Sequence, residues 1–348
     1  MSLPTPLSTD TGTELCLASG PPRLPRGVAA FRGRGHAKLF AVPLDPLLVP
    51  HLGAMNALRF GADGMHGEAA GDRSELAEAA PEVAGTTDHR VPVAGGEITV
   101  RIYTPFGSGP FPAHLHLHGG GFWVGMLEQS DTKCRETAQG AGCVVVAVGY
   151  RLAPKHKFPV ALEDCFTALE WVVANAAELG IDVSRLSVGG VSAGANLATV
   201  VTVMARDRGG PPLVFQVLEV PVTDLTLSFP SMTEYGTGYV LTEEACARNA
   251  RLYLADPDQA TDPYASPYFA DDLSGLPPAL VVTAEFDPVR DEGEAYAQSL
   301  EAAGVAVTSV RMRGHVHGSM AFTNLLPSAR EHRALVHASL RAAYRQPV

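Results

Sequence analysis

Residues 143–150 read Cys-Val-Val-Val-Ala-Val-Gly-Tyr, a short apolar run that is rich in β-branched side chains. Such a run is typical of a central parallel strand that is buried on both faces. Other apolar or alternating stretches read as further strands, and helix-forming stretches lie between them. This alternation predicts an α/β chain with a mostly parallel central sheet and helices on both faces. The other expected strands are 97–104, 113–118, 185–191, 214–222, 279–284 and 305–311, and the expected helices are 129–141, 159–178, 193–207, 289–303 and 328–343.

One segment departs from this alternation. Residues 223–275 lie between two expected strands but are far longer than a crossover helix needs. They contain a helix from Thr242 to Leu254, with Thr242 as its expected N-cap and Glu243 and Glu244 in its first turn. We expect an N-terminal arm at 1–35, cap helices at 36–85, the core at 86–222 and 276–348, and a cap insertion at 223–275.

The composition describes a chain that can bury a large core, and it narrows the range of partners. The 348 residues are 46% hydrophobic and carry a formal net charge of −11. A negative surface argues against nucleic acid and against anionic membranes, because both need basic patches. The longest apolar stretch, around 140–149, is too short to cross a bilayer, and the first residues lack the basic start and apolar run of a signal peptide.

The cysteines indicate a reducing compartment. They are odd in number, widely spaced and form no C-x-x-C pair, which favours free thiols over a disulfide framework or a zinc site. We therefore expect a cytoplasmic protein that binds a small molecule, without nucleic acid or membrane as a partner. The oligomeric state is left open, with a homodimer through the last strand or the final helix as one arrangement. The five cysteines are Cys16, Cys134, Cys143, Cys165 and Cys246.

The segment Gly190-Val191-Ser192-Ala193-Gly194 has the G-x-S-x-G pattern of a nucleophile on a sharp turn. A chain with 35 glycines produces such matches by chance. This match, however, follows a strand and opens a helix, which is the context that a strained strand-to-helix turn requires. The positive end of the helix also points at the site. Ser192 is therefore the candidate nucleophile.

A second motif, His118-Gly119-Gly120-Gly121-Phe122, directly follows the strand at 113–118. Three glycines let the backbone approach a substrate and aim N–H groups at it. Such donors stabilise the oxyanion of a tetrahedral intermediate by about 3–4 kcal/mol each. The N–H of the residue after the nucleophile, here Ala193, usually forms the other wall of the hole. We expect the bulky Phe122 and Trp123 to line the substrate pocket and to limit its length.

The same strand carries three histidines, His114, His116 and His118, on one face. This spacing resembles a metal site, but no carboxylate or cysteine nearby completes a ligand set. We therefore expect no metal and no other cofactor. His118 is expected to orient the glycine loop, and the other two histidines are expected to be buried and hydrogen-bonded.

A serine nucleophile needs a base, and the base needs an orienting acid. In α/β folds of this kind the acid and then the histidine follow the serine along the chain. Asp287 follows one strand and precedes Pro288, with Glu285 as the competing acid, whereas Asp291 reads as a helix-start residue. His315 and His317 follow the last strand, and both fit the base by position.

Together these motifs resemble those of the bacterial hormone-sensitive-lipase-like esterases of the α/β-hydrolase superfamily, over roughly residues 90–345. The resemblance implies His317, not His315, as the base. It also implies Gly120, Gly121 and Ala193 as oxyanion donors, and a helical cap above the site. The matching segments are His118-Gly119-Gly120-Gly121, Tyr150-Arg151-Leu152-Ala153-Pro154, Phe158-Pro159, Glu163-Asp164, Gly275-Leu276-Pro277-Pro278, 287–293 and His317-Gly318.

The chain departs from the family pattern beside the nucleophile. The family elbow usually reads Gly-Asp-Ser-Ala-Gly-Gly, whereas Val191 and Ala195 stand here in place of the Asp and the second Gly. Val289 replaces a usual Leu, and Ser319 replaces a usual aromatic residue. The missing Asp is not a triad member, so acyl transfer is expected to persist. The rate, the pH profile or the shape of the pocket beside Val191 is expected to change.

The leading hypothesis is a serine carboxylesterase that hydrolyses short-to-medium acyl esters through an acyl-enzyme on Ser192. Asp287 and His317 complete its triad, and activity is expected to fall at acid pH as His317 becomes protonated. One alternative is hydrolysis of lactones or amides, or acyl transfer, on the same triad. The other is a non-catalytic ligand-binding protein on the same fold.

Overall fold

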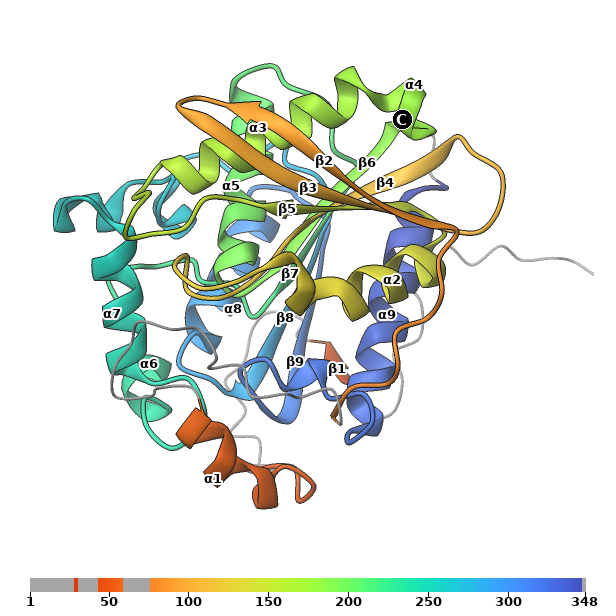
Figure 1. Ribbon diagram of the computed structural model, residues 1–348. Coiled ribbons are helices and arrows are strands. Elements are labelled where there is room, and N and C mark those ends of the chain that lie inside the picture. The colour runs from red at the N-terminus through yellow and green to blue at the C-terminus, as the bar shows by residue number, and fades with distance from the viewer. Residues whose placement is uncertain (1–27, 31–42, 59–75, 346–348) are drawn as a thin grey trace, which may run out of the picture.

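The computed structural model describes residues 28–30, 43–58 and 76–345 (Figure 1). Of the arm expected at 1–35 only residues 28–30 are described, and residues 36–42 and 59–75 of the expected cap helices lie outside the described residues. No helix in the described ranges is long and apolar enough to cross a membrane.

A single twisted sheet runs through the centre of the molecule (Figure 1). Its nine described strands lie in the order β1-β9-β8-β7-β6-β4-β5-β3-β2. The six strands β4 to β9 are parallel to one another, and β1, β2 and β3 pair antiparallel. This is the mostly parallel sheet that the strand–helix alternation predicts. The strands are β1 (Val28–Ala30), β2 (Gly85–Val93), β3 (Gly96–Thr104), β4 (Phe111–Leu117), β5 (Val144–Gly149), β6 (Ile181–Val191), β7 (Phe215–Glu219), β8 (Ala279–Phe286) and β9 (Val307–Val316).

Helices cover both faces of the sheet, as Figure 1 shows. On one face, α2 (Asp131–Ala141) and α9 (Pro327–Ala343) pack into an apolar cluster with residues of β5, β8 and β9. On the other, α3 (Val160–Ala174), α5 (Ala193–Asp207) and α8 (Arg290–Ala302) pack into a second cluster with β4 and β6. The short α4 (Ala176–Leu179) follows α3 directly. Burial of the Val-rich β5 between these clusters explains its continuous apolar sequence.

The edge strand β2 is absent from the elements expected from the sequence. Most of its side chains are exposed or half-buried, and its sequence, Gly-Thr-Thr-Asp-His-Arg-Val-Pro-Val, is largely polar. It is held by backbone pairing with β3 and by the ion pair between Arg101 and Asp88, whose Nε and Oδ1 atoms are 2.7 Å apart. A strand with one thin apolar stripe gives little sequence signal. At the other edge, β1 pairs with residues 310–312 of β9.

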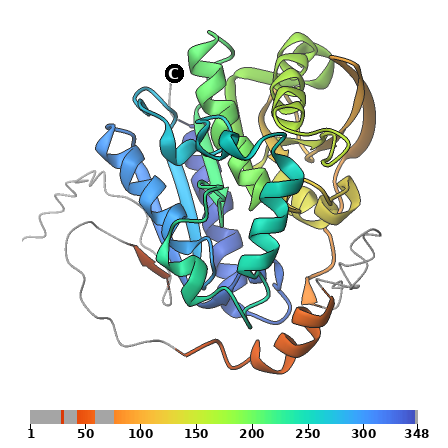
Figure 2. The ribbon, with the colours of Figure 1, turned by 90° about the vertical axis from the view of Figure 1, so that its left-hand side faces the viewer.

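The expected insertion carries α6 (Pro230–Glu234) and α7 (Glu243–Tyr253), which lie outside the core helices (Figure 2). The N-cap prediction is confirmed, because the Thr242 hydroxyl accepts a hydrogen bond from the amide of Ala245 at 3.1 Å. The N-terminal helix α1 (Val49–Leu58) contacts this insertion through Asn56. The Asn56 side chain donates to the carbonyl of Gly238 at 3.2 Å and accepts from the amide of Val240 at 2.8 Å. The two segments expected to form the cap therefore contact each other.

The Tyr-Arg-Leu-Ala-Pro segment after β5 joins three parts of the core. The guanidinium of Arg151 donates two hydrogen bonds to the buried carboxylate of Asp164 on α3, at 2.9 and 2.7 Å. The backbone amide of Arg151 donates to the same carboxylate at 3.0 Å. Tyr150 donates its phenol proton to the carbonyl of His118 at 2.7 Å. The segment therefore fixes the end of β5 to α3 and to the start of the glycine loop.

Replacing Asp164 with Ala tests this anchor. The change leaves the guanidinium of Arg151 without its buried partner, so we expect the free energy of unfolding to fall by about 3 kcal/mol. The neighbouring pair between Glu163 and Arg208 is exposed on both sides. Glu163→Ala is therefore the matched control and should cost less than about 1 kcal/mol. Equal urea-denaturation midpoints for the two variants would contradict the anchor role of Asp164.

Candidate active site

Ser192 lies on the turn between β6 and α5 with φ 57° and ψ −120°. Non-glycine residues rarely adopt a positive φ, and such strain costs of the order of 1–3 kcal/mol. The amide of Ser192 donates to the carbonyl of Glu219 on β7 at 2.9 Å, which holds the strained residue against the sheet. The turn lifts the side chain above the carboxyl end of β6.

The two outer glycines of the pattern are required by close approach of the backbone. A Cβ on Gly190 would lie 2.4 Å from the carbonyl of Gly194. A Cβ on Gly194 would lie 2.1 Å from the carbonyl oxygen of Leu117 at the end of β4. The G-x-S-x-G match is therefore a packing requirement of this turn and not a chance feature of a glycine-rich chain.

A continuous hydrogen-bonded chain joins a serine, a histidine and an aspartate. The Oγ atom of Ser192 lies 3.0 Å from Nε2 of His317, and Nδ1 of His317 lies 2.7 Å from Oδ2 of Asp287. Asp287 is fully buried and His317 is 3% exposed. Because Nδ1 donates to the carboxylate, the neutral ring has Nε2 free to accept the serine proton. The other carboxylate oxygen accepts the amide of Val289 at 3.1 Å, which fixes the orientation of Asp287.

The structure gives the competing acids and the competing histidine other partners. Glu285 accepts the amide of Gly314 at 2.8 Å, and Asp291 accepts the amide of Ser231 at 3.0 Å. His315 lies between two serine hydroxyls, with Nδ1 2.8 Å from Oγ of Ser319 and Nε2 2.8 Å from Oγ of Ser328. Burial lowers the pKa of His315 to about 3, so its ring stays neutral. These side chains brace the loops that carry Asp287 and His317.

Each of the three joined residues is the first residue after a parallel strand. Ser192 follows β6, Asp287 follows β8 and His317 follows β9. Since parallel strands end at one edge of the sheet, this position brings side chains that are far apart in the sequence to one place.

The amides expected to bind an oxyanion surround this serine. Ala193 is the first residue of α5, so its N–H has no partner within the helix. Among the described residues, the amides of Gly120 and Gly121 donate no hydrogen bond to the backbone. Gly120 has φ 120°, and a Cβ there would lie 1.9 Å from the carbonyl oxygen of Val124. The glycine loop therefore keeps a conformation that leaves donors available beside Ser192.

The three strand histidines are buried. His118 donates from Nδ1 to the carbonyl of Gly119 at 2.8 Å, and its ring stacks on Tyr150 with centroids 4.1 Å apart. His118 thus supports the glycine loop. His114 hydrogen-bonds through Nδ1 to Oγ of Ser187 at 2.9 Å, and burial lowers its pKa to about 3. Nε2 of His116 has no hydrogen-bond partner among the described residues, unlike the expectation from the sequence.

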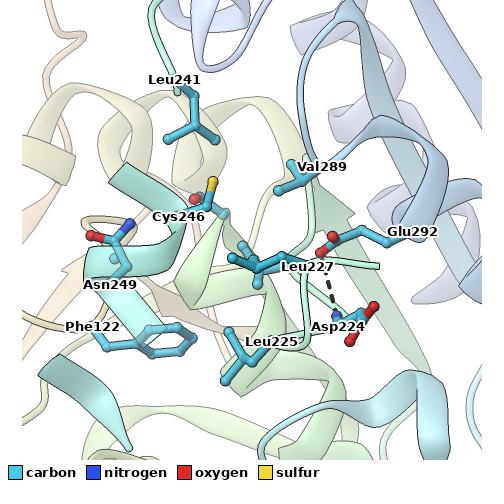
Figure 3. A pocket seen from close by; sticks show the side chains of 12 residues that line it. Phe122, Asp224, Leu225, Leu227, Leu241, Cys246, Asn249, Val289 and Glu292 are labelled. Carbon is cyan, nitrogen blue, oxygen red and sulfur yellow. Dashed lines mark hydrogen bonds between the residues drawn. The ribbon is translucent and has the colours of Figure 1, made fainter. Parts of the chain in front are cut away.

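A pocket opens beside Ser192, with an empty volume of about 360 Å³ that includes its mouth. Figure 3 shows its side chains; six of the twelve lining residues come from the insertion, and two of these six are on α7. Burial raises the pKa of the Glu292 carboxyl in its wall well above the usual range. The lining residues are Gly121, Phe122, Ser192, Val222, Asp224, Leu225, Leu227, Leu241, Cys246, Asn249, Val289 and Glu292.

The sequence places Phe122, Trp123 and Val191 in this pocket, and of these only Phe122 is among the residues that line it. Trp123 instead turns its indole towards α7, where Nε1 donates to Oδ1 of Asn249 at 2.7 Å. Val191 packs against the apolar cluster under α2 and α9. The lining residues from the insertion had no sequence signal beyond the unusual length of that segment.

This site defines the protein as a serine hydrolase on a mostly parallel α/β sheet. A strained serine, an imidazole and a buried carboxylate are hydrogen-bonded in series, and amides without backbone partners lie beside the serine.

Comparisons with known proteins agree with this class. The chain belongs to the alpha/beta hydrolase fold family whose profile matches residues 114–321. Carboxylesterase NlhH of Mycobacterium tuberculosis is 43% identical over 239 residues, which are 68% of this chain and 75% of that relative. The ethyl acetate hydrolase of Pseudomonas putida is 40% identical over 253 residues, 71% of this chain and 79% of that relative. A hyperthermophilic esterase from the archaeon Pyrobaculum calidifontis superposes with a TM-score of 0.81 and 41% identity, covering 86% of this chain and 98% of that one.

Replacing Asp287 with Asn tests the assignment of the acid. The amide would favour the wrong tautomer of His317, so we expect kcat to fall by about 10⁴-fold with an unchanged fold. Glu285→Gln is the control, because Glu285 is the other candidate acid in this segment. The kcat of this variant should fall less than about tenfold. Steady-state kinetics on one p-nitrophenyl ester measure both, and a larger loss in Glu285→Gln would exclude Asp287 as the acid.

Proposed function

We propose that this chain, a carboxylesterase, hydrolyses esters of short to medium acyl chains through an acyl-enzyme on Ser192. The main support for the proposed acyl length is the small apolar pocket beside the serine. The space of about 360 Å³ includes the open mouth of the pocket, so the enclosed part is smaller still. The name of the related ethyl acetate hydrolase denotes a short ester, which supports the same proposal.

The reaction follows from the geometry of the triad. Ser192 attacks the ester carbonyl while His317 takes the serine proton through Nε2, and His317 then gives the proton to the leaving alcohol. Asp287 holds the imidazole and stabilises its positive charge. Water enters, His317 removes its proton, and the acyl-enzyme is hydrolysed. In both steps the amides of Gly120, Gly121 and Ala193 are proposed to bind the oxyanion.

One wall of the pocket is held rigidly. The ring of Phe122 stacks on Tyr253 of α7, with centroids 3.8 Å apart and planes 7° apart. Tyr253 is fully buried, so Phe122 cannot swing outward to lengthen the pocket. Leu225 and Leu241 are nearly buried further along the lining. A long acyl chain would have to displace side chains that are already packed.

The same triad could attack lactones or amides, or transfer the acyl group to an alcohol. No contact in the described pocket favours these reactions over ester hydrolysis.

We also propose a cytoplasmic location. The four cysteines within the described ranges, Cys134, Cys143, Cys165 and Cys246, are all buried and form no disulfide with one another. Burial raises the pKa of the Cys143 thiol to about 12, which keeps it protonated and unreactive.

A homodimer through α9 is proposed in preference to one through the last strand, because β1 already occupies part of the outer edge of β9. Light scattering of the purified chain tests this proposal, and a monomer mass would exclude it.

A series of p-nitrophenyl esters tests the acyl-length proposal. We expect kcat/KM to be greatest for acetyl to hexanoyl esters and at least about tenfold lower for a chain of about ten carbons. Leu227→Ala removes a half-buried side chain from the lining and should reduce this discrimination by about threefold or more. Val183→Ala is the control, since Val183 is an exposed apolar residue near the far end of β6. A preference of the native enzyme for the longest ester would overturn the proposal.

A further inference from the structure

Asn249 is a polar residue of the cap helix α7 that faces the reacting serine. It lines the same pocket as Ser192 and Gly121, and its side chain is half-buried. Nothing in the mechanism above uses it. Its position, on the insertion and not on the sheet, makes it a candidate for selecting substrates and not for the acyl-transfer chemistry.

The orientation of the Asn249 amide is fixed by its neighbour. The indole N–H of Trp123 can only donate a hydrogen bond, so the atom of Asn249 that lies 2.7 Å from it is the oxygen. Trp123 is itself held by the guanidinium of Arg248, which lies 5.1 Å from the centroid of a Trp123 ring. The Nδ2 group of Asn249 therefore points the other way. Figure 3 shows this nitrogen on the side of the amide that faces the pocket, with the oxygen turned away.

The amide lies directly over the oxyanion loop. A Cβ on Gly121 would lie 2.5 Å from both Cγ and Nδ2 of Asn249 and 2.7 Å from its Oδ1, so the amide can pack this closely only because residue 121 is a glycine. The Gly121 amide is an expected ligand of the ester carbonyl. A donor packed against Gly121 is thus close to substrate atoms next to that carbonyl.

The Nδ2 group has unused hydrogen-bonding capacity, whereas the carboxylate of Asp224 does not. In the described part of the chain, the hydrogen bond that the Asn249 side chain makes is the one accepted from Trp123. Asp224 accepts from the backbone and the hydroxyl of Thr226 and of Ser228. Most other lining side chains are apolar. An amide donor in an apolar wall favours substrates that carry an acceptor oxygen over substrates with a plain hydrocarbon chain. The hydrocarbon chain leaves the donor without a hydrogen-bond partner.

We propose that Asn249 is a specificity-determining residue that donates a hydrogen bond from Nδ2 to an acceptor oxygen of the substrate close to the ester carbonyl. The preferred substrates are then esters in which one to three atoms separate an ether, keto or hydroxyl oxygen from that carbonyl carbon. This inference rests on the proposed esterase function of the Ser192 site and names the substrate class for it.

A pair of isosteric esters tests the proposal. p-Nitrophenyl methoxyacetate and p-nitrophenyl butyrate differ only by an oxygen in place of a methylene, and dividing by their hydroxide rate constants removes the difference in intrinsic reactivity. Asn249→Asp keeps an oxygen for the Trp123 indole but loses the donor. We expect the corrected methoxyacetate-to-butyrate ratio of kcat/KM to fall by about tenfold in this variant, the loss of one hydrogen bond. Asn249→Ala, which introduces no charge, should show the same fall.

The matched control is Trp123→Phe. It keeps the Nδ2 donor but removes the hydrogen bond that fixes the amide, so the corrected ratio should fall by less than in Asn249→Asp, even if kcat falls as well. A merely structural role for Asn249 predicts the opposite pattern, with both esters losing activity equally in Asn249→Asp and Asn249→Ala.

A second pair, 2-methoxyethyl butyrate and butyl butyrate, places the same oxygen on the alcohol side. A tenfold change of the ratio in either pair supports the proposal and tells which side of the ester contacts Asn249. Unchanged ratios in both pairs overturn it. Hydrolysis of plain butyrate by the native enzyme measures the esterase function separately, so its loss would not be mistaken for a failure of the Asn249 proposal.

Discussion

The close approach of three backbones around Ser192 is the constraint on which the rest of the site depends. The start of α5 lies so near the end of β4 that Gly194 has no room for a Cβ beside the carbonyl of Leu117. Ser192, between these two elements, has a positive φ, and its amide donates a hydrogen bond to the carbonyl of Glu219. The surrounding sheet and helices supply enough packing energy to keep one unfavourable residue in place. The glycine loop begins at the end of β4, next to this contact, and therefore lies beside the nucleophile.

Much of this arrangement could be predicted from the sequence because the parallel strands are buried on both faces and read as apolar runs. The choices between Asp287 and Glu285, and between His317 and His315, were harder, because members of each pair are two residues apart and on a strand point to the same face. The residue pattern favoured Asp287, which lies further beyond the strand than Glu285. It left both histidines open, and the family resemblance selected His317. The structure separates them by where each strand ends. Glu285 and His315 still belong to β8 and β9, whereas Asp287 and His317 are the first residues beyond them.

The cap could not be predicted in the same detail. Its helix α7 was visible because Thr242 and two glutamates mark its start, but its contacts with the core depend on side chains that carry no pattern. Phe122 and Trp123 are examples. Their size suggested a role in the pocket, yet Phe122 is fixed by Tyr253 and Trp123 by Asn249, both on α7. Such pairings join residues more than 100 positions apart, and a single sequence does not reveal them.

The pairing of β1 with β9 has a consequence for how the enzyme forms during synthesis. It joins residues 28–30 to residues 310–312, so that sheet edge can close only after β9 has been made. Contacts over such separations form late, because a long loop must be closed first. His317 follows this last strand directly. A nascent chain can therefore assemble the elbow and the glycine loop around Ser192 early, but it has no base until the residue that follows β9 has been made, so hydrolytic activity cannot begin before β9 is in place.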